Sequence, residues 1–214
     1  MFIPKRVFFE QDALAYPLGR ELQKRFKGDK IPVSIITSHN RFRFVTKFTG
    51  VDGLLNASHN GHTRFRFSIN TEHIIRSYEG GTPASAARLR AARRVAEAGY
   101  PLGFLIAPIF VYPGWQDDYT GLIRNLAGEL KDHPAENVTF ELISHRFTLS
   151  AKKRIMEIYP DTTLPMDESE RKFKFGQFGY GKYVYPKETL QEMDELFRRK
   201  LDKHFPGAKV EYLV

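Results

Sequence analysis

Two segments in the first third of the chain alternate strictly between apolar and polar side chains. They are FRFVTKF at residues 42–48 and TRFRFSI at residues 63–69. A period of two places alternate side chains on opposite faces of a β-strand, so each segment predicts a strand with one apolar face rich in Phe. We expect the apolar face to pack on helices. The other face carries Arg, Lys and Ser, and we expect it to line a lumen or cleft, as in a barrel.

Helices and strands alternate along the rest of the chain, which predicts parallel β/α units. The run LGFLIAPIFV at residues 102–111 is almost entirely apolar, which is typical of a central parallel strand. The other expected elements are an extended segment at 2–9, helices at 12–26, 51–55, 71–79, 117–133, 150–159 and 187–204, and strands at 33–37, 138–143 and 209–213.

One helix, expected to begin near residue 82, has the clearest end signals. Thr82 is placed as its N-cap, Pro83 lies in its first turn, and Gly99 follows its last residue. Its stripe of Ala and Leu predicts a buried face, with Arg88 on the opposite side.

A basic and aromatic stretch, Arg171–Tyr185, reads RKFKFGQFGYGKYVY. It holds four basic residues, no acidic ones, six aromatic residues and three glycines. Alternation on both sides of the glycines predicts a β-hairpin. Cations for phosphates and aromatic rings for bases are typical of a nucleic-acid reader. The alternative is an edge hairpin that packs its aromatic rings on the core and leaves its charges in water.

Composition narrows the classes of function. A net charge of +8 and a pI near 9.6 favour a polyanionic partner. The chain has no cysteine, which excludes disulfides, thiol nucleophiles and cysteine-held metal or iron–sulfur sites. No apolar run approaches the roughly 20 residues that span a bilayer, and the start of the chain lacks the pattern of a secretory signal. We expect a cytoplasmic protein without a membrane partner.

Several single residues are candidates for chemistry. Lys47 and Ser68 lie late in their strands on the polar face, where they would hold an anionic or polar ligand. The alternative is a solvated strand face. Glu141 has apolar neighbours and is expected to be a buried acid in an ion pair with an Arg. His59 and His62 are close enough to suggest a metal, but a role in capping a loop is the better interpretation.

Long segments throughout the chain resemble the spore photoproduct lyase family, in the family's order. They are PKRVFFEQDALAYPLGREL, TSHN, FVTKF, HNGHTRFRFSIN, AGYPLGFLIAPI, VTFELISHRFT, the hairpin and FPGAKVEYLV. The resemblance implies a radical S-adenosylmethionine enzyme that repairs the spore photoproduct, a thymine dimer in ultraviolet-damaged DNA. In the family, a CxxxCxxC motif holds the iron–sulfur cluster that cleaves S-adenosylmethionine, and a further cysteine returns a hydrogen atom. The implied fold is a partial β/α barrel with an added DNA-binding hairpin.

The same resemblance assigns roles to individual residues. It implies that Lys47, Ser68 and Ala107 line an S-adenosylmethionine site. It implies a partner, double-stranded DNA with thymine photolesions. The implied DNA-binding residues are Lys172, Lys174 and Lys182 at phosphates, and Gln177, Phe178, Tyr180 and Tyr183 near bases or the lesion. Family members carry Arg–Tyr where this chain has Gln177 and Phe178, so its grip on the lesion is expected to differ.

The chain departs from the family between Asn40 and Phe42. Family members carry a long segment there with the first barrel strands, the cluster motif and the hydrogen-donor cysteine, and this chain has only Arg41. The expected fold is therefore an α/β partial barrel of the radical S-adenosylmethionine type, reduced to its later strands. We divide it into an extended and helical segment at 1–40, the β/α part at 41–165, and the hairpin with the C-terminal helix at 166–214.

The missing segment has functional consequences. Without thiolates, no cluster of the family's type can be bound, so we expect this chain to be catalytically inactive as it stands. The strand at 42–48 becomes a sheet edge, which predicts low stability or self-association. The alternatives are a non-catalytic DNA-binding remnant, a deletion or assembly artefact of the full enzyme, and complementation by a protein that supplies the missing half.

Overall fold

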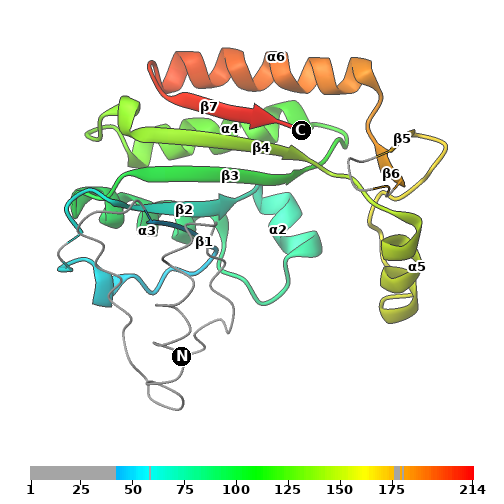
Figure 1. Ribbon diagram of the computed structural model, residues 1–214, viewed down its shortest axis with the longest axis horizontal. Coiled ribbons are helices and arrows are strands. Elements are labelled where there is room, and N and C mark those ends of the chain that lie inside the picture. The colour runs from blue at the N-terminus through cyan, green and yellow to red at the C-terminus, as the bar shows by residue number, and fades with distance from the viewer. Residues whose placement is uncertain (1–41, 58, 176–178, 180) are drawn as a thin grey trace.

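A computed structural model describes residues 42–57, 59–175, 179 and 181–214. Its centre is a five-stranded sheet in the order β1-β2-β3-β4-β7 (Figure 1). Every neighbouring pair in this sheet is parallel. The strands are β1 (Phe42–Thr46), β2 (Thr63–Ile69), β3 (Leu102–Ile109), β4 (Val138–Ser144) and β7 (Lys209–Leu213). The predicted parallel β/α architecture is confirmed, and the apolar run forms the central strand β3.

Helices follow the strands as the alternation predicted. They are α2 (Glu72–Tyr78), α3 (Ser85–Glu97), α4 (Trp115–Glu129), α5 (Leu149–Ile158) and α6 (Lys187–His204), with short 3₁₀ turns at Asp52–Leu54 and Ala135–Asn137. In Figure 1, α3 and α4 lie behind the sheet and α6 runs beside β7. Boundaries differ from the predicted ones by a few residues, most visibly in α4, which begins at Trp115 after Gly114 with a φ of 84°.

The apolar face of the sheet packs on α3, α4 and α6, as expected. A row of aromatic rings crosses it: Phe67 lies 6.5 Å from Phe104, and Phe104 lies 5.7 Å from Phe140, between ring centroids. All three side chains are fully buried. Burial of large rings of this kind supplies most of the hydrophobic stabilisation of such a layer.

Two predictions about α3 are wrong. The helix begins at Ser85 rather than at Thr82, and its N-cap, Ala84, makes no side-chain cap. The Thr82 hydroxyl instead donates to the carbonyl of Glu79 at 2.7 Å, so this residue belongs to the preceding turn. Arg88 was placed opposite the buried face, but it is fully buried. Arg88 can be buried because its guanidinium pairs with the carboxylate of Glu79, which is buried as well.

The predicted hairpin is confirmed as a separate antiparallel pair, β5 (Lys172–Phe175) and β6 (Gly181–Val184). It lies with α5 beyond the carboxyl end of β4 (Figure 1). The tip residues Gln177, Phe178 and Tyr180 fall outside the described residues. So do the elements predicted at 2–9, 12–26 and 33–37.

Among the described strands, β1 pairs only with β2 and so forms one edge of the sheet. Association of chains through that edge stays a prediction, as does the division at residues 40 and 165. No helix within the described ranges is both long and apolar enough to cross a membrane.

Candidate nucleic-acid interface and polar sheet face

The register of the hairpin could not be predicted from the sequence. In the structure, it puts the lysines and the aromatic residues on opposite faces. Lys174 pairs with Lys182, and Phe173 pairs with Tyr183. Directly opposed residues of an antiparallel pair project from the same face, and neighbours along a strand project from opposite faces. The three lysines Lys172, Lys174 and Lys182 therefore share one face, and the aromatic residues share the other.

The lysine face is open to solvent, and its charged residues are all cations. Lys172 and Lys174 are exposed, and Lys182 is half-buried. Within the part of the chain that the structure describes, none of the three has a carboxylate partner. An anionic ligand would therefore meet these charges without displacing a resident ion pair.

The aromatic face is partly covered by its own residues. Phe173 lies 5.3 Å from Tyr183 and 5.1 Å from Phe175 between ring centroids. Gly181 lies directly under the Phe173 ring, where any Cβ would clash with it. Towards the tip the rings become exposed, with 51% of Phe173 and 73% of Phe175 accessible. These rings are available for stacking.

A residue outside the hairpin fixes its base. Phe147, which follows β4, exchanges two backbone hydrogen bonds with Tyr183: each amide donates to the other's carbonyl, at 3.2 and 2.7 Å. The two rings stack with centroids 5.3 Å apart and an interplanar angle of 12°. Phe147 is buried, so it anchors the exposed hairpin to the body of the protein. Sequence analysis missed this role, although SHRFT at residues 144–148 alternates with a period of two.

Arg171 is a second anchor at the same place. Its guanidinium is buried, donates to the carbonyls of His145 and Pro165 at 3.0 and 2.9 Å, and lies 3.6 Å from the centroid of the Tyr185 ring. Burial and the Arg171 charge together lower the pKa of His145 to about 4. His145 is therefore neutral at physiological pH, as a close neighbour of a buried cation must be.

Near the carboxyl ends of β1–β3 lie the residues predicted for a cofactor. Ser68 is the penultimate residue of β2 and is buried, Lys47 directly follows β1, and Ala107 lies late in β3. The carboxyl ends of parallel strands are where α/β folds bind ligands. The hairpin lies at the same end of the sheet (Figure 1).

A buried ionic network joins Lys47 to Ser68. Lys47 Nζ lies 3.0 Å from Glu79 Oε1, and Arg88 Nη2 donates to Glu79 Oε2 at 2.7 Å. Arg88 Nη1 also donates to the backbone carbonyl of Ser68 at 3.1 Å. The Lys47 side chain, which was predicted to hold a ligand, is thus 34% exposed and forms an ion pair with the buried Glu79. Two cations and one anion leave the cluster with a net positive charge.

The prediction for Glu141 is confirmed. Its carboxylate accepts two hydrogen bonds from Arg66, one of them from Nε at 2.7 Å, and a third from the Tyr212 hydroxyl at 2.6 Å. Arg66 crosses β3 at Gly103, where a Cβ would lie 2.9 Å from Arg66 Cγ. Both charged side chains are buried, so this is a structural ion pair that ties β2, β4 and β7 together.

The interpretation of His59 as a loop cap is also confirmed. Its Nδ1 accepts from the Gly61 amide at 3.1 Å, its Nε2 lies 3.1 Å from the carbonyl of Ala98, and its ring stacks on Tyr100 at 3.6 Å. Among the residues described, no group of three or more His, Cys, Asp or Glu is arranged to hold a metal.

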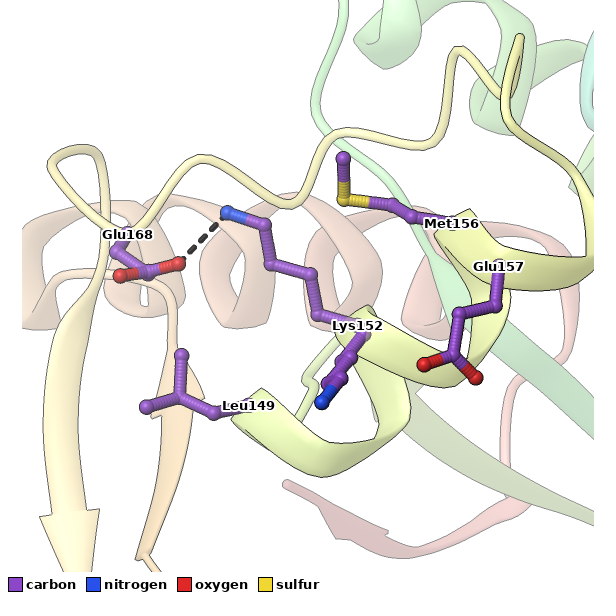
Figure 2. A pocket seen from close by; sticks show the side chains of 6 residues that line it. Leu149, Lys152, Met156, Glu157 and Glu168 are labelled. Atoms are coloured by element: carbon purple, nitrogen blue, oxygen red, sulfur yellow. Dashed lines mark hydrogen bonds and ion pairs between the residues drawn. The ribbon is translucent and has the colours of Figure 1, made fainter.

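A shallow depression of about 540 Å³ lies elsewhere, on α5. Figure 2 shows Lys152 crossing it to reach Glu168, at 2.6 Å. Leu149, Met156 and Glu157 also line it. None of the predicted site residues borders it, so it belongs to neither candidate site.

Comparison with known proteins gives one consistent result. The family model described as "Spore photoproduct lyase" matches residues 2–43 and 41–214, so the two matched segments meet where the internal loss was placed. Spore photoproduct lyase of Geobacillus sp. (strain Y412MC61) is 49% identical over 83% of this chain and 52% of the relative. The Clostridium acetobutylicum protein of the same name is 41% identical over 99% of this chain and 62% of the relative.

Solved structures agree. A structure described as spore photoproduct lyase complexed with dinucleoside spore photoproduct has a TM-score of 0.79 and 49% identity, covering 83% of this chain and 52% of that one. A mutant with bound AdoMet and dinucleoside spore photoproduct has a TM-score of 0.79 and 45% identity, covering 95% and 57%. The chain thus spans little more than half the length of the relatives it matches.

Proposed function

Because the chain belongs to the spore photoproduct lyase family, we propose that it serves the repair of spore photoproduct in ultraviolet-damaged DNA through DNA recognition. By itself it does not catalyse the radical step. The observation that carries the first part is the lysine face of the hairpin, where three cations without acidic partners among the described residues project from one side of β5–β6. Neutralisation of phosphates by such a surface is the main source of DNA affinity.

The proposed roles of individual residues are those that the family resemblance implies. Lys172, Lys174 and Lys182 contact phosphates. Gln177, Phe178, Tyr180 and Tyr183 approach bases or the lesion. A relative was solved with dinucleoside spore photoproduct, which supports a lesion-bearing duplex as the ligand of this chain.

Lys182→Ala is expected to weaken binding of a thymine-rich duplex by one phosphate contact. The slope of log K against log salt concentration should become shallower by about 0.9, because binding then neutralises one phosphate fewer and releases fewer counterions from the DNA. Fluorescence anisotropy over a range of KCl concentrations measures it. Lys182→Arg keeps the charge and should retain the slope. Wild-type binding that is absent or independent of salt would rule out the DNA-recognition function.

The residues of the polar sheet face fit part of the family's cofactor chemistry. A carboxylate such as that of S-adenosylmethionine suits the exposed side of Lys47, whose other side is held by Glu79. We therefore assign Lys47, Ser68 and Ala107 to one wall of an S-adenosylmethionine site. When bound beside a reduced cluster, this cofactor supplies an adenosyl radical.

The iron–sulfur cluster does not fit this chain. None of its 214 residues is a cysteine, so no thiolate is present to hold iron or to donate a hydrogen atom. No step of the reaction is therefore assigned to this chain alone.

Anaerobic reconstitution with iron and sulfide tests whether this chain can bind a cluster and cleave S-adenosylmethionine. We expect no cluster absorbance after desalting and no cleavage of S-adenosylmethionine under reducing conditions. A full-length, cysteine-bearing relative treated in parallel controls for the procedure. A stable cluster with turnover in this chain would contradict the proposal.

A further inference from the structure

The segment after β4 lies beside the hairpin and is joined to β6 by one isolated antiparallel bridge. Phe147 and Tyr183 exchange both backbone hydrogen bonds, which defines an antiparallel pair with a fixed register. The order across this ribbon is β5, β6 and then the segment at 146–148. The stacked Phe147 and Tyr183 rings lie on its aromatic face.

This register decides where Arg146 projects. Neighbours along an extended segment point to opposite faces, so Arg146 lies on the side opposite Phe147. That side is the one from which Lys172, Lys174 and Lys182 project. Arg146 is exposed, and it has no ion-pair partner among the described residues.

The positive charge of Arg146 acts on Lys182. The pKa of Lys182 is lowered, first by partial burial and then by the positive charges of Arg146 and Lys174. Arg146, Lys174 and Lys182 carry like charges that repel one another, and together they create a local positive potential. An anion bound between them would relieve the repulsion.

We propose that Arg146 is a further DNA-contacting residue. The DNA-binding surface is then one face of the hairpin together with the bridged segment beside it, and it carries Arg146, Lys172, Lys174 and Lys182. This inference rests on the proposed DNA-recognition function and extends it beyond the hairpin. A guanidinium suits the role because it can donate two parallel hydrogen bonds to one phosphate. Arg146 precedes the buried, bridged Phe147 at the base of the hairpin, whereas Lys174 lies further toward the tip.

This arrangement leaves the aromatic face, which includes Tyr183, available for the contacts with bases or the lesion proposed above. Phe173 and Phe175 project from the opposite side of the ribbon, so a duplex backbone on the cationic face does not cover them. The cationic face therefore contacts phosphates, and its contribution to DNA affinity does not depend on the base sequence.

The test compares three forms of the full chain on one short thymine-rich duplex: wild type, Arg146→Ala and Arg90→Ala. Arg90 is an exposed arginine of α3, behind the sheet and without an ion pair among the described residues, so its removal matches the change in net charge. Anisotropy titrations over a range of KCl concentrations give the salt slope. Arg146→Ala should make the slope shallower by about 0.9 and weaken binding several-fold at low salt. Arg90→Ala should leave both unchanged.

Three outcomes separate the hypotheses. A slope for Arg146→Ala equal to that of wild type overturns the inference while leaving DNA recognition by the lysines intact. Equal effects of the two arginine variants show a response to net charge alone and also overturn it. Absence of binding by wild type overturns the proposed function itself. Arg146→Lys should keep the slope because it keeps the charge, and an unchanged thermal melt of each variant shows that the fold is retained.

Discussion

Arg88→Met is expected to lower the free energy of unfolding by about 3–5 kcal/mol, because it leaves the buried carboxylate of Glu79 with only the partly exposed Lys47 as a cationic partner. Arg88 has no exposed side-chain surface, and it donates to Glu79 at 2.7 Å, to Thr82 at 2.7 Å and to the carbonyl of Pro83 at 2.8 Å. Methionine fills a similar volume, so the loss reports the charge and the hydrogen bonds rather than a cavity. Urea denaturation followed by the fluorescence of the buried Trp115 measures it.

A double variant separates the ion pair from its surroundings. Removing both charges with Arg88→Met and Glu79→Gln should cost less than Arg88→Met alone, since no buried anion that has lost its guanidinium remains. Glu79→Gln by itself should also weaken the hold on Lys47. A loss below about 1 kcal/mol for Arg88→Met would mean that water reaches Glu79 in the variant and replaces the guanidinium.

Acid is expected to destabilise the protein through His145. In the unfolded chain this imidazole takes a proton near pH 6.5, whereas in the folded chain its pKa is about 4 because of burial and the Arg171 charge. Between these values the unfolded state binds more protons, so stability is complete above pH 6.5 and is lost as the pH falls toward 4. The loss attributable to His145 is about 3 kcal/mol.

His145→Phe is the matched control for this effect. The ring lies between Phe110, at 4.5 Å, and Phe147, at 6.0 Å, so another aromatic ring fits the site. Free energies of unfolding measured from pH 7 to pH 4 should fall more steeply for wild type than for the variant. Parallel curves would show that His145 is not the titrating group. A protonated imidazole would face the Arg171 guanidinium, whose Nη2 lies 3.4 Å from His145 Nδ1, so the base of the hairpin should loosen first.

Local patterns predicted most of the architecture. Alternation in residues 63–69 placed Phe65 and Phe67 in the core, and the apolar run at 102–111 identified the central strand. Both follow from backbone geometry, since a strand exposes alternate side chains to one face and a central parallel strand is covered on both. The ion pair of Glu141 was predictable for a similar reason: a lone carboxylate between apolar neighbours must find a cation.

The α3 region shows where such reasoning fails. Helical periodicity put Arg88 on the side away from the core, and Thr82 looked like an N-cap. Their actual roles depend on Glu79, which belongs to the end of α2 and accepts from Arg88 across the intervening turn. No helical pattern contains that contact, because it joins two elements through a turn.

The amino-acid sequence by itself determined that this chain has no thiolate for a cluster, that it carries a basic and aromatic hairpin, and that its strands form a parallel β/α layer. Only the tertiary structure decided that three lysines share one face and that Phe147 bridges the hairpin beside Arg146. The physical reason is that composition and periodicity are properties of one segment, whereas register is set between segments. A shift of one residue in the pairing of β5 with β6 would have mixed the cationic and aromatic faces.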